Sequence, residues 1–230
     1  MSLIGVVRLG QYFDNDPNVK SNQKIISFTI KDSKFDFISD NGVFSKGKID
    51  DGSIALLKQI LKCAEIKGDI LDLGAGYGTI GLTLASLYRE ANFLLIDVNT
   101  RACALARMNK SRFGLHNVEI IESNIFDKIQ DKTFDIIITN PPIRAGKKVI
   151  YNMFEDSYKH LNPNGKLYIV IRKDQGANTA SRFIEGVFGN ITLLGRDKGY
   201  YIFEAIKKSK LENTENKEDL QWAKKQKSKE

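Results

Sequence analysis

The residues best suited to chemistry stand in the segment TNPPIRAGKK, residues 139–148. The apolar run FDIIIT comes directly before it, so the catalytic candidates lie just beyond a buried strand: Asn140, Pro141, Pro142 and Ile143. The Asn140 side-chain carbonyl and the Pro141 backbone carbonyl are two hydrogen-bond acceptors, and the fixed φ of proline aims them. Such a pair can hold both N–H groups of an amine whose lone pair is delocalised into a ring. Taken alone, the motif would serve equally well to end a strand.

A glycine-rich loop is expected in LDLGAGYGTIG, residues 71–81. Its glycines allow a sharp turn from strand to helix and let a ligand lie against bare backbone. Gly76, Gly78 and Gly81 also match the dinucleotide pattern G-x-G-x-x-G, with Asp97 at nearly the expected distance. An NAD-dependent dehydrogenase is therefore an alternative interpretation.

Asp72, two positions before the first glycine, favours a different ligand. A carboxylate beside the loop would repel a pyrophosphate, whereas it attracts an ammonium group. S-adenosyl-L-methionine carries an ammonium and a sulfonium and no phosphate, so it is the expected cofactor. Asp97, at the end of the second strand, would accept its ribose hydroxyls, with Val98 beside it.

After the third expected strand, Asn124 is suited to hydrogen-bond an adenine edge and Ile125 to pack on the ring. An ordinary turn residue is the alternative for Asn124. The cofactor-binding candidates are therefore Asp72, Gly74, Ala75, Gly76, Tyr77, Gly78, Asp97, Val98, Asn124, Ile125 and Asn140.

The elements that must position these residues alternate along the chain. Apolar runs that predict strands alternate with segments that predict helices, which is typical of βαβ units and a parallel sheet. The strands are expected at residues 69–73, 92–97, 118–123, 134–139 and 166–172, and the helices at about 78–89, 99–112, 149–160 and 176–187. Two further runs, NITLLG and YYIFEAIK, are joined by a short turn and predict an antiparallel hairpin. The fold class is α/β, a Rossmann-like, doubly wound sheet of seven mostly parallel strands.

Three segments are expected. Residues 1–52 form a β-rich N-terminal extension and lid, with strand-like runs between about 24 and 50. Residues 53–207 form the catalytic domain, which opens with a helix to about residue 64. Residues 208–230 form a charged tail, too polar to build a core.

Composition and charge indicate which partner, metal content and cellular location to expect. The chain has 230 residues and a formal net charge of +7, which suits a polyanionic partner. Its two cysteines and two histidines lack metal-ligand spacing, so no metal is expected. No apolar run approaches the length of a membrane span, and no signal-peptide pattern opens the chain, which favours a cytoplasmic protein.

The motifs DLGAGYG, NPPI and GVFSKGKIDDGS together resemble the RsmC-like class I methyltransferases, the small-subunit ribosomal RNA guanine-N2 methyltransferases. The resemblance covers about residues 10–207 and implies that residues 42–53 cover the cofactor. It adds these candidates for the cofactor site or its lid: Phe44, Lys46, Gly47, Asp50 and Ser53. It also implies ribosomal RNA or a ribosomal subunit as partner. Some family members carry a second, degenerate half before the catalytic one, whereas only residues 1–50 precede the catalytic core here.

Ile143 departs from the motif, which usually has an aromatic residue there to stack on a flipped base. Phe44 or Phe13 is a candidate to supply the stacking. A basic rim that contacts RNA is expected from Arg144, Lys147, Lys148, Arg172 and Lys173.

The sequence therefore predicts an S-adenosylmethionine-dependent N-methyltransferase that acts on guanine N2 of ribosomal RNA. Adenine in RNA or DNA, or a protein glutamine amide, offers the same NH2 group and stays open as acceptor. An inactive RNA-binding module that keeps the cofactor pocket is an alternative of another class. Oligomeric state is left open.

Overall fold

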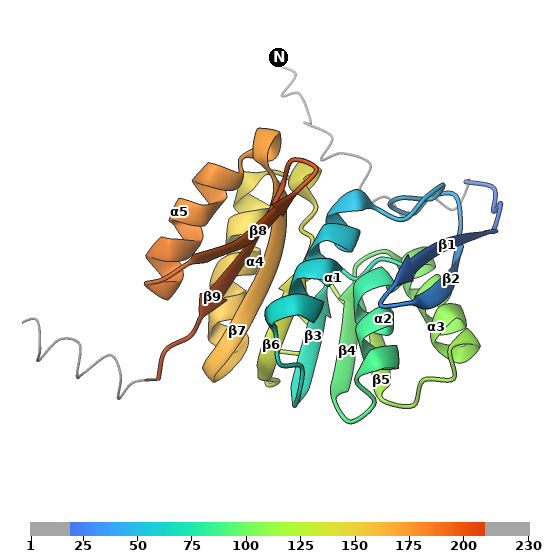
Figure 1. Ribbon diagram of the computed structural model, residues 1–230, viewed down its shortest axis with the longest axis horizontal. Coiled ribbons are helices and arrows are strands. Elements are labelled where there is room, and N and C mark those ends of the chain that lie inside the picture. Colours follow the sequence, from blue (N-terminus) through green and yellow to red (C-terminus); the bar gives the residue numbers. More distant parts are fainter. Residues whose placement is uncertain (1–18, 210–230) are drawn as a thin grey trace, which may run out of the picture.

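A computed structural model describes residues 19–209 and places a seven-stranded sheet at the centre of the molecule (Figure 1). The strand order is β5-β4-β3-β6-β7-β9-β8. The strands are β3 (Asp69–Leu73), β4 (Asn92–Asp97), β5 (Val118–Glu122), β6 (Phe134–Thr139), β7 (Leu161–Arg172), β8 (Thr192–Asp197) and β9 (Tyr200–Ile206). The first five are parallel, and β9 pairs antiparallel with both β7 and β8. The expected fold class and terminal hairpin are confirmed.

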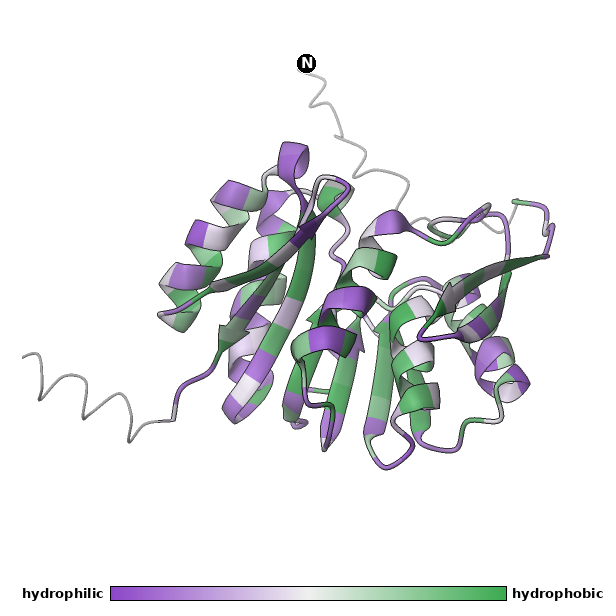
Figure 2. Ribbon diagram, in the orientation of Figure 1, coloured by the Kyte–Doolittle hydropathy of each residue, from purple (hydrophilic) through white to green (hydrophobic). Residues whose placement is uncertain are grey.

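Helices cover both faces of this sheet. On one face lie α1 (Asp51–Cys63), α2 (Thr79–Leu87) and α3 (Thr100–Arg112), and on the other lie α4 (Lys147–His160) and α5 (Ala177–Phe188) (Figure 1). Two short 3-10 turns, η1 (Ile143–Ala145) and η2 (Lys173–Gln175), precede α4 and α5. Each face has its own apolar cluster, with Leu56 and Leu82 in one and Phe154 and Ile184 in the other. Figure 2 shows hydrophobic colour along the central strands and on α2, whereas α1 and α5 carry hydrophilic and hydrophobic residues together.

The central strands read as unbroken apolar runs because both of their faces are buried. Ile70 and Ile138 contribute to the cluster under α1 and α2, while Leu71 and Ile137 contribute to the opposite cluster. Since β3 lies between β4 and β6, the loops that follow these three strands meet at one carboxyl edge of the sheet.

A separate two-stranded sheet, β1 (Lys24–Ile30) and β2 (Ser33–Ser39), packs beside α3. Phe37 is fully buried, and its ring meets Phe113 edge-on at a centroid distance of 4.9 Å. Asn109 Nδ2 donates to the carbonyls of Ile38 and Tyr77, each at 3.0 Å. Asn109 thus ties this small sheet to the glycine loop.

Three segments differ in extent or type between the sequence-based prediction and the structure. Residues 42–49, expected within a β-rich region, form consecutive turns, because Gly42 and Ser45 take positive φ values that a strand excludes. The strand expected from residue 166 begins at Leu161, where it pairs with Phe134. Helix α1 begins at Asp51 rather than at 53, since the side chain of Asp50 caps it.

Some expectations fall outside the described residues: those for Phe13, for the start of the N-terminal extension and for residues 210–230 of the tail. Between residues 19 and 209 the helices are all too short or too polar to cross a bilayer. Over the same range, no cluster of three or more His, Cys, Asp or Glu side chains is arranged to hold a metal ion.

Candidate cofactor and acceptor site

The glycine loop turns the chain from β3 into α2 through three left-handed glycines, with φ of +77° at Gly74, +58° at Gly76 and +95° at Gly78. The N–H groups of Gly74 and Ala75 donate to the carbonyl of Ile96 at 2.9 and 3.0 Å. The loop is therefore fastened to the end of β4. Residues with a Cβ adopt this backbone only at a cost, which is the reason for glycine here.

Asp97 is held at the end of β4 by backbone donors. Its Oδ2 accepts from Gly76 N at 2.7 Å and its Oδ1 from Asn99 N at 2.8 Å. The side chain is buried, and burial raises the pKa of its carboxyl. Each carboxylate oxygen has a further lone pair, so hydroxyl groups of a ligand can still be bound.

Asp72 is more deeply buried, with 1% of its surface exposed. Its Oδ2 accepts from Gly81 N, in the first turn of α2, at 2.7 Å. Burial, with a smaller contribution from the negative charge of Asp97, raises the pKa of Asp72 to about 7, although the bond from Gly81 N opposes this change. A Cβ at Gly81 would lie 2.9 Å from this oxygen and 2.7 Å from Leu95, so only glycine fits. A cation bound nearby would favour the carboxylate form of Asp72.

Two small pockets meet at Gly74 and include most of the predicted cofactor residues. One is largely apolar and contains the carboxylate of Asp97; its lining is Leu73, Gly74, Ile96, Asp97, Val98, Ser123, Asn124, Ile125, Pro142, Val149 and Met153. The other contains Asp72 and Asn140; its lining is Phe44, Ser45, Asp50, Ser53, Asp72, Gly74, Ala75, Gly76, Tyr77, Thr79, Ile80 and Asn140. The pair fits a ligand with an apolar, hydroxyl-bearing end and a cationic end.

Asn124 and Ile125 form the turn after β5. The Asn124 side-chain amide donates to Asp127 Oδ2 at 3.0 Å, so it serves the turn as well as lining the pocket. Ile125 has φ of +49°, a strained conformation for a β-branched residue, and Ser123 Oγ donates to its carbonyl at 3.1 Å. Strain held by neighbouring hydrogen bonds at a pocket wall is typical of functional turns.

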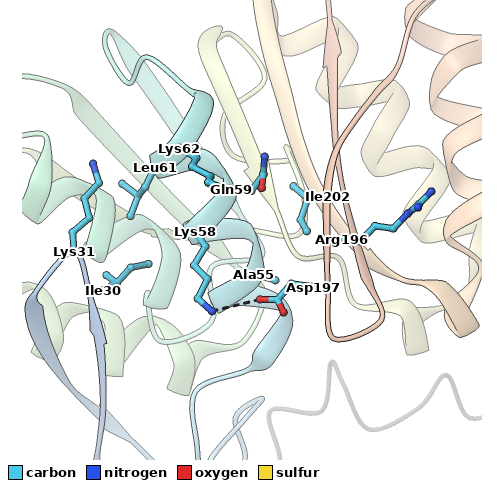
Figure 3. Close-up of a pocket in the computed structure, with 10 residues that line it drawn as sticks. All are labelled: Ile30, Lys31, Ala55, Lys58, Gln59, Leu61, Lys62, Arg196, Asp197 and Ile202. Carbon is cyan, nitrogen blue, oxygen red and sulfur yellow. Dashed lines mark hydrogen bonds and ion pairs between the residues drawn. The ribbon is translucent and has the colours of Figure 1, made fainter.

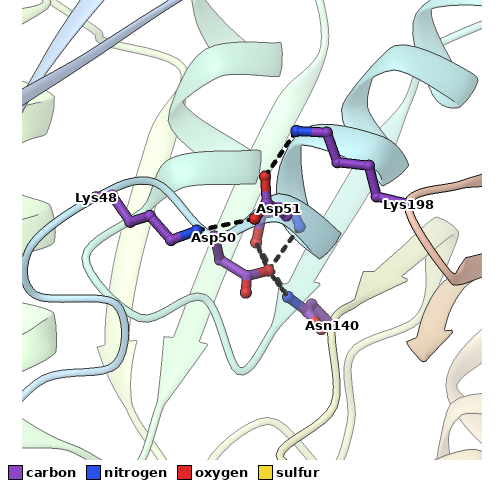
Figure 4. Close-up of polar contacts among 6 residues, drawn as sticks. Lys48, Asp50, Asp51, Asn140 and Lys198 are labelled. Atoms are coloured by element: carbon purple, nitrogen blue, oxygen red, sulfur yellow. Dashed lines mark hydrogen bonds and ion pairs between the residues drawn. The ribbon is translucent and has the colours of Figure 1, made fainter. Parts of the chain in front are cut away.

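Asn140 follows β6, and its amide nitrogen faces the start of α1 (Figure 4). Nδ2 donates to Asp50 Oδ2 at 2.8 Å and to Ser53 Oγ at 3.0 Å. The same Asp50 oxygen accepts from Ser53 N at 2.7 Å and from Ser53 Oγ at 3.2 Å. The end of β6 is also tied to β3, because Thr139 Oγ1 donates to the carbonyl of Leu73 at 2.8 Å.

The residues after Asn140 point in different directions. Pro141 is buried, and Pro142 lines the apolar pocket. Ile143 is partly buried and packs against the apolar cluster under α4 and α5. Phe44 lies across the site in the turns before α1 and is 50% exposed.

The described residues of the expected basic rim are exposed, and one of them forms an ion pair. Lys147, Lys148 and Lys173 are exposed, and Arg172 Nε contacts Asp174 Oδ1 at 3.0 Å. The Arg172 guanidinium also lies 6.0 Å from the centre of the Tyr200 ring. The side chain of Arg144 is not among those described.

Three predicted cofactor residues line neither pocket: Lys46, Gly47 and Gly78. Gly78 instead caps α2, where a Cβ would meet Leu82 at 2.5 Å. The sequence did not predict several other lining residues. They are Ser45, Thr79 and Ile80 in the pocket with Asp72, and Leu73, Ile96, Ser123, Val149 and Met153 in the pocket with Asp97. Thr79 and Ile80 directly follow the glycines, so their position in the motif could have identified them.

A wider groove, of about 440 Å³, lies beside α1 and outside this site (Figure 3). Lys31, Lys58 and Lys62 border it, but Lys58 pairs with Asp197 at 3.5 Å and the Arg196 side chain points away, over the ring of Tyr201. The groove has neither a glycine loop nor a buried carboxylate. We therefore place the candidate site at the two smaller pockets.

Comparison with known proteins identifies similar chains. A family model described as methyltransferase small domain matches residues 34–204. An uncharacterized protein of Bacillus subtilis (strain 168), YbxB, is 45% identical over 197 residues, which are 85% of this chain and 98% of that protein. Ribosomal RNA small subunit methyltransferase C of Pseudomonas entomophila (strain L48) is 28% identical over 204 residues, covering 84% of this chain and 58% of that protein.

Among solved structures, a similar one is the 16S rRNA N2 G1207 methyltransferase (RsmC) of T. thermophilus in complex with AdoMet and guanosine. It superposes with a TM-score of 0.74 at 25% identity, covering 84% of this chain and 52% of that one. The chain thus spans only 58% of the Pseudomonas protein and 52% of the Thermus chain.

Proposed function

The chain belongs to the methyltransferase small domain family and is an S-adenosylmethionine-dependent methyltransferase of the RsmC-like type, and we propose that its acceptor is guanine N2 in ribosomal RNA. The observation that carries this proposal is the position of Asn140. Its amide lines the same pocket as the buried carboxylate of Asp72. An acceptor amine held by Asn140 would therefore stand next to the cationic end of the cofactor.

The residues present fit this cofactor. Asp97, in the apolar pocket, would bind the ribose hydroxyls, and Ile125 would pack on the adenine. Asp72 lines the same pocket as Gly74, Ala75 and Gly76, and its carboxylate would attract the ammonium group bound there. In its carboxylate form Asp72 can do so, whereas it would repel a phosphate, which disfavours a dinucleotide.

The chemistry of transfer requires no base before the bond forms. When bound, the cofactor would supply the methyl group: the amine lone pair would form the N–C bond, the C–S electron pair would go to sulfur, and the nitrogen would then lose a proton to water. Asn140 Oδ1 and the Pro141 carbonyl would accept the two N–H groups and draw the nitrogen toward tetrahedral geometry. The hydrogen bond from Thr139 Oγ1 to the carbonyl of Leu73 fixes the end of β6. The two prolines restrict the backbone that carries these acceptors.

Guanine is favoured among the exocyclic amines by one of the similar proteins, and ribosomal RNA is favoured by two of them. The Thermus protein is described as an N2 guanine methyltransferase and is bound to guanosine, and the Pseudomonas protein is named as a ribosomal RNA methyltransferase. The net charge of +7 is compatible with an RNA partner.

The test is methyl transfer from tritiated S-adenosylmethionine to ribosomal RNA from cells that lack this protein, followed by nucleoside analysis. We expect label in N2-methylguanosine and its loss with Asn140→Ala. Label in N6-methyladenosine, or in protein when ribosomal subunits are the substrate, would reject guanine N2. No label in any acceptor despite cofactor binding would favour an inactive binding module.

A further inference from the structure

We propose that Asp50 is a positioning residue that sets which end of the Asn140 amide faces the acceptor. This inference rests on the proposed function, because it gives the orientation of Asn140 a consequence for transfer. The family resemblance suggests a cofactor or lid role for Asp50 and Ser53. Both residues line the pocket that contains Asp72, and the contacts of both side chains also converge on Asn140.

A side-chain amide has two ends of similar shape and opposite hydrogen-bonding character. Rotation by half a turn would exchange Oδ1 and Nδ2 of Asn140 with little change in packing. Only the orientation with Nδ2 toward α1 leaves Oδ1 available to accept an N–H from a substrate amine. The surroundings of Asn140 must therefore decide between the two orientations.

The hydrogen bonds around Asp50 decide it. A carboxylate can only accept, so Asp50 Oδ2, at 2.8 Å, requires the NH2 end of Asn140. Ser53 has one hydroxyl proton, which it donates to Asp50 at 3.2 Å, so Ser53 Oγ must accept from Asn140 at 3.0 Å. Both amide protons of Asn140 are then used. The reversed amide would place Oδ1 against the carboxylate.

The position of Asp50 is itself fixed. It is the N-cap of α1, where its Oδ2 accepts from Ser53 N at 2.7 Å. Gly52, two residues later, has no room for a side chain. A Cβ there would lie 2.9 Å from Asp50 Oδ2 and 2.8 Å from the Tyr200 ring. The carboxylate oxygen is thus held in a closely packed setting before substrate binds.

Asp50→Ser separates orientation from folding. Serine is as good an N-cap as aspartate, so α1 keeps its start. A hydroxyl can donate as well as accept, so it can bond to either end of the Asn140 amide and no longer imposes its orientation. We expect kcat to fall by about 10- to 100-fold, as for one lost preorganised contact, with the Kd of S-adenosylmethionine within about twofold.

A double-mutant cycle tests whether Asp50 acts through Asn140. Adding Asp50→Ser to Asn140→Ala should change kcat by less than about twofold, because the group that Asp50 orients is already gone. The matched control is Asp51→Ser, next in the chain, whose carboxylate contacts Lys48 at 2.9 Å and Lys198 at 3.1 Å and makes no contact with Asn140 (Figure 4). We expect this control to keep kcat within about twofold, since exposed ion pairs contribute little.

Two kinetic results would overturn the inference. A raised Kd for S-adenosylmethionine with unchanged kcat in Asp50→Ser would make Asp50 a cofactor contact. A full further loss of kcat in the double variant would show that Asp50 acts independently of Asn140.

A measurement without substrate separates this inference from the proposed function. In ¹⁵N-labelled protein, the Asn140 side-chain NH2 should be protected from hydrogen exchange, and Asp50→Ser should remove that protection. Absence of methyl transfer by the wild-type protein, together with this loss of protection, would reject the proposed acceptor and keep the orienting contact. An unprotected Asn140 amide in the wild-type protein would reject the orienting contact itself.

Discussion

The affinity for S-adenosylmethionine should depend on pH through Asp72. Burial raises the pKa of this carboxyl from 3.8 to about 7 in the cofactor-free protein. A cationic ligand binds the carboxylate form better than the neutral acid, so below pH 7 the site must first lose a proton. The affinity is therefore expected to weaken as pH falls.

The size of the effect follows from this pKa. If only the carboxylate form binds, the apparent Kd scales as the inverse of the ionised fraction, and it should be about 25-fold higher at pH 5.5 than at pH 7.5. The ammonium of the ligand stays mostly protonated over this range, since α-amino groups titrate near about 8. Asp72→Asn should weaken binding at pH 7.5 and remove most of this dependence. Any dependence that remains belongs to Asp97, whose pKa burial also raises.

Isothermal titration calorimetry measures both quantities. Titrations in buffers of different ionisation enthalpy should show release of nearly one proton per cofactor bound at pH 6 from Asp72. A flat Kd between pH 5.5 and 7.5 in the wild-type protein, or equal affinity in Asp72→Asn, would refute the assignment of Asp72 to the cationic end of the ligand.

The raised pKa of Asp72 makes the folded protein less stable as pH rises, whereas it makes cofactor binding stronger. Because the folded-state pKa of Asp72 lies above 3.8, the folded protein binds more protons between pH 4 and 7, and this contribution to stability is lost as pH rises through about 7. Asp72→Asn keeps an acceptor for Gly81 N and removes the buried charge. Differential scanning calorimetry should therefore show a higher Tm for cofactor-free Asp72→Asn than for the wild-type protein at pH 7.5, and a smaller difference at pH 5.

The remaining predictions concern other parts of the site. Asp97→Ala should weaken cofactor binding by about 2 kcal/mol in calorimetry, as expected for hydroxyls that lose a charged acceptor, and unchanged affinity would remove Asp97 from the ribose site. Gly81→Ala should lower the Tm and the cofactor affinity together, because its Cβ would meet Leu95 at 2.7 Å and Asp72 at 2.9 Å; normal values of both would contradict this packing. Lys147→Ala should weaken RNA binding and reduce the salt slope by about one. Lys132→Ala should not, because Lys132 lies just before β6, at the amino ends of the parallel strands, and pairs with Glu119 at 3.3 Å.

The order of the elements could be read from the sequence because it is written in local patterns. Apolar runs near Leu71, Leu94 and Ile137 mark strands buried on both faces, and glycines at positive φ mark the turn into α2. The two candidate pockets likewise lie next to motifs that are contiguous in the chain. Where an element depended on its partner, the local pattern failed: Leu161 joins β7 because it pairs with Phe134, and residues 42–49 form turns despite their apolar members.

Tertiary structure decided how the site residues act on one another. The sequence by itself identified Asp72, Asp97 and Asn140, since each directly precedes or follows a recognisable strand end or glycine loop. It did not indicate that Asp50, 90 residues before Asn140, bonds to that amide. That contact exists because α1 crosses the sheet with its N-terminus above the end of β6, an arrangement produced by packing across the apolar core (Figure 1). A hydrogen bond between distant segments leaves no periodicity or spacing in a single sequence, so only the folded chain shows it.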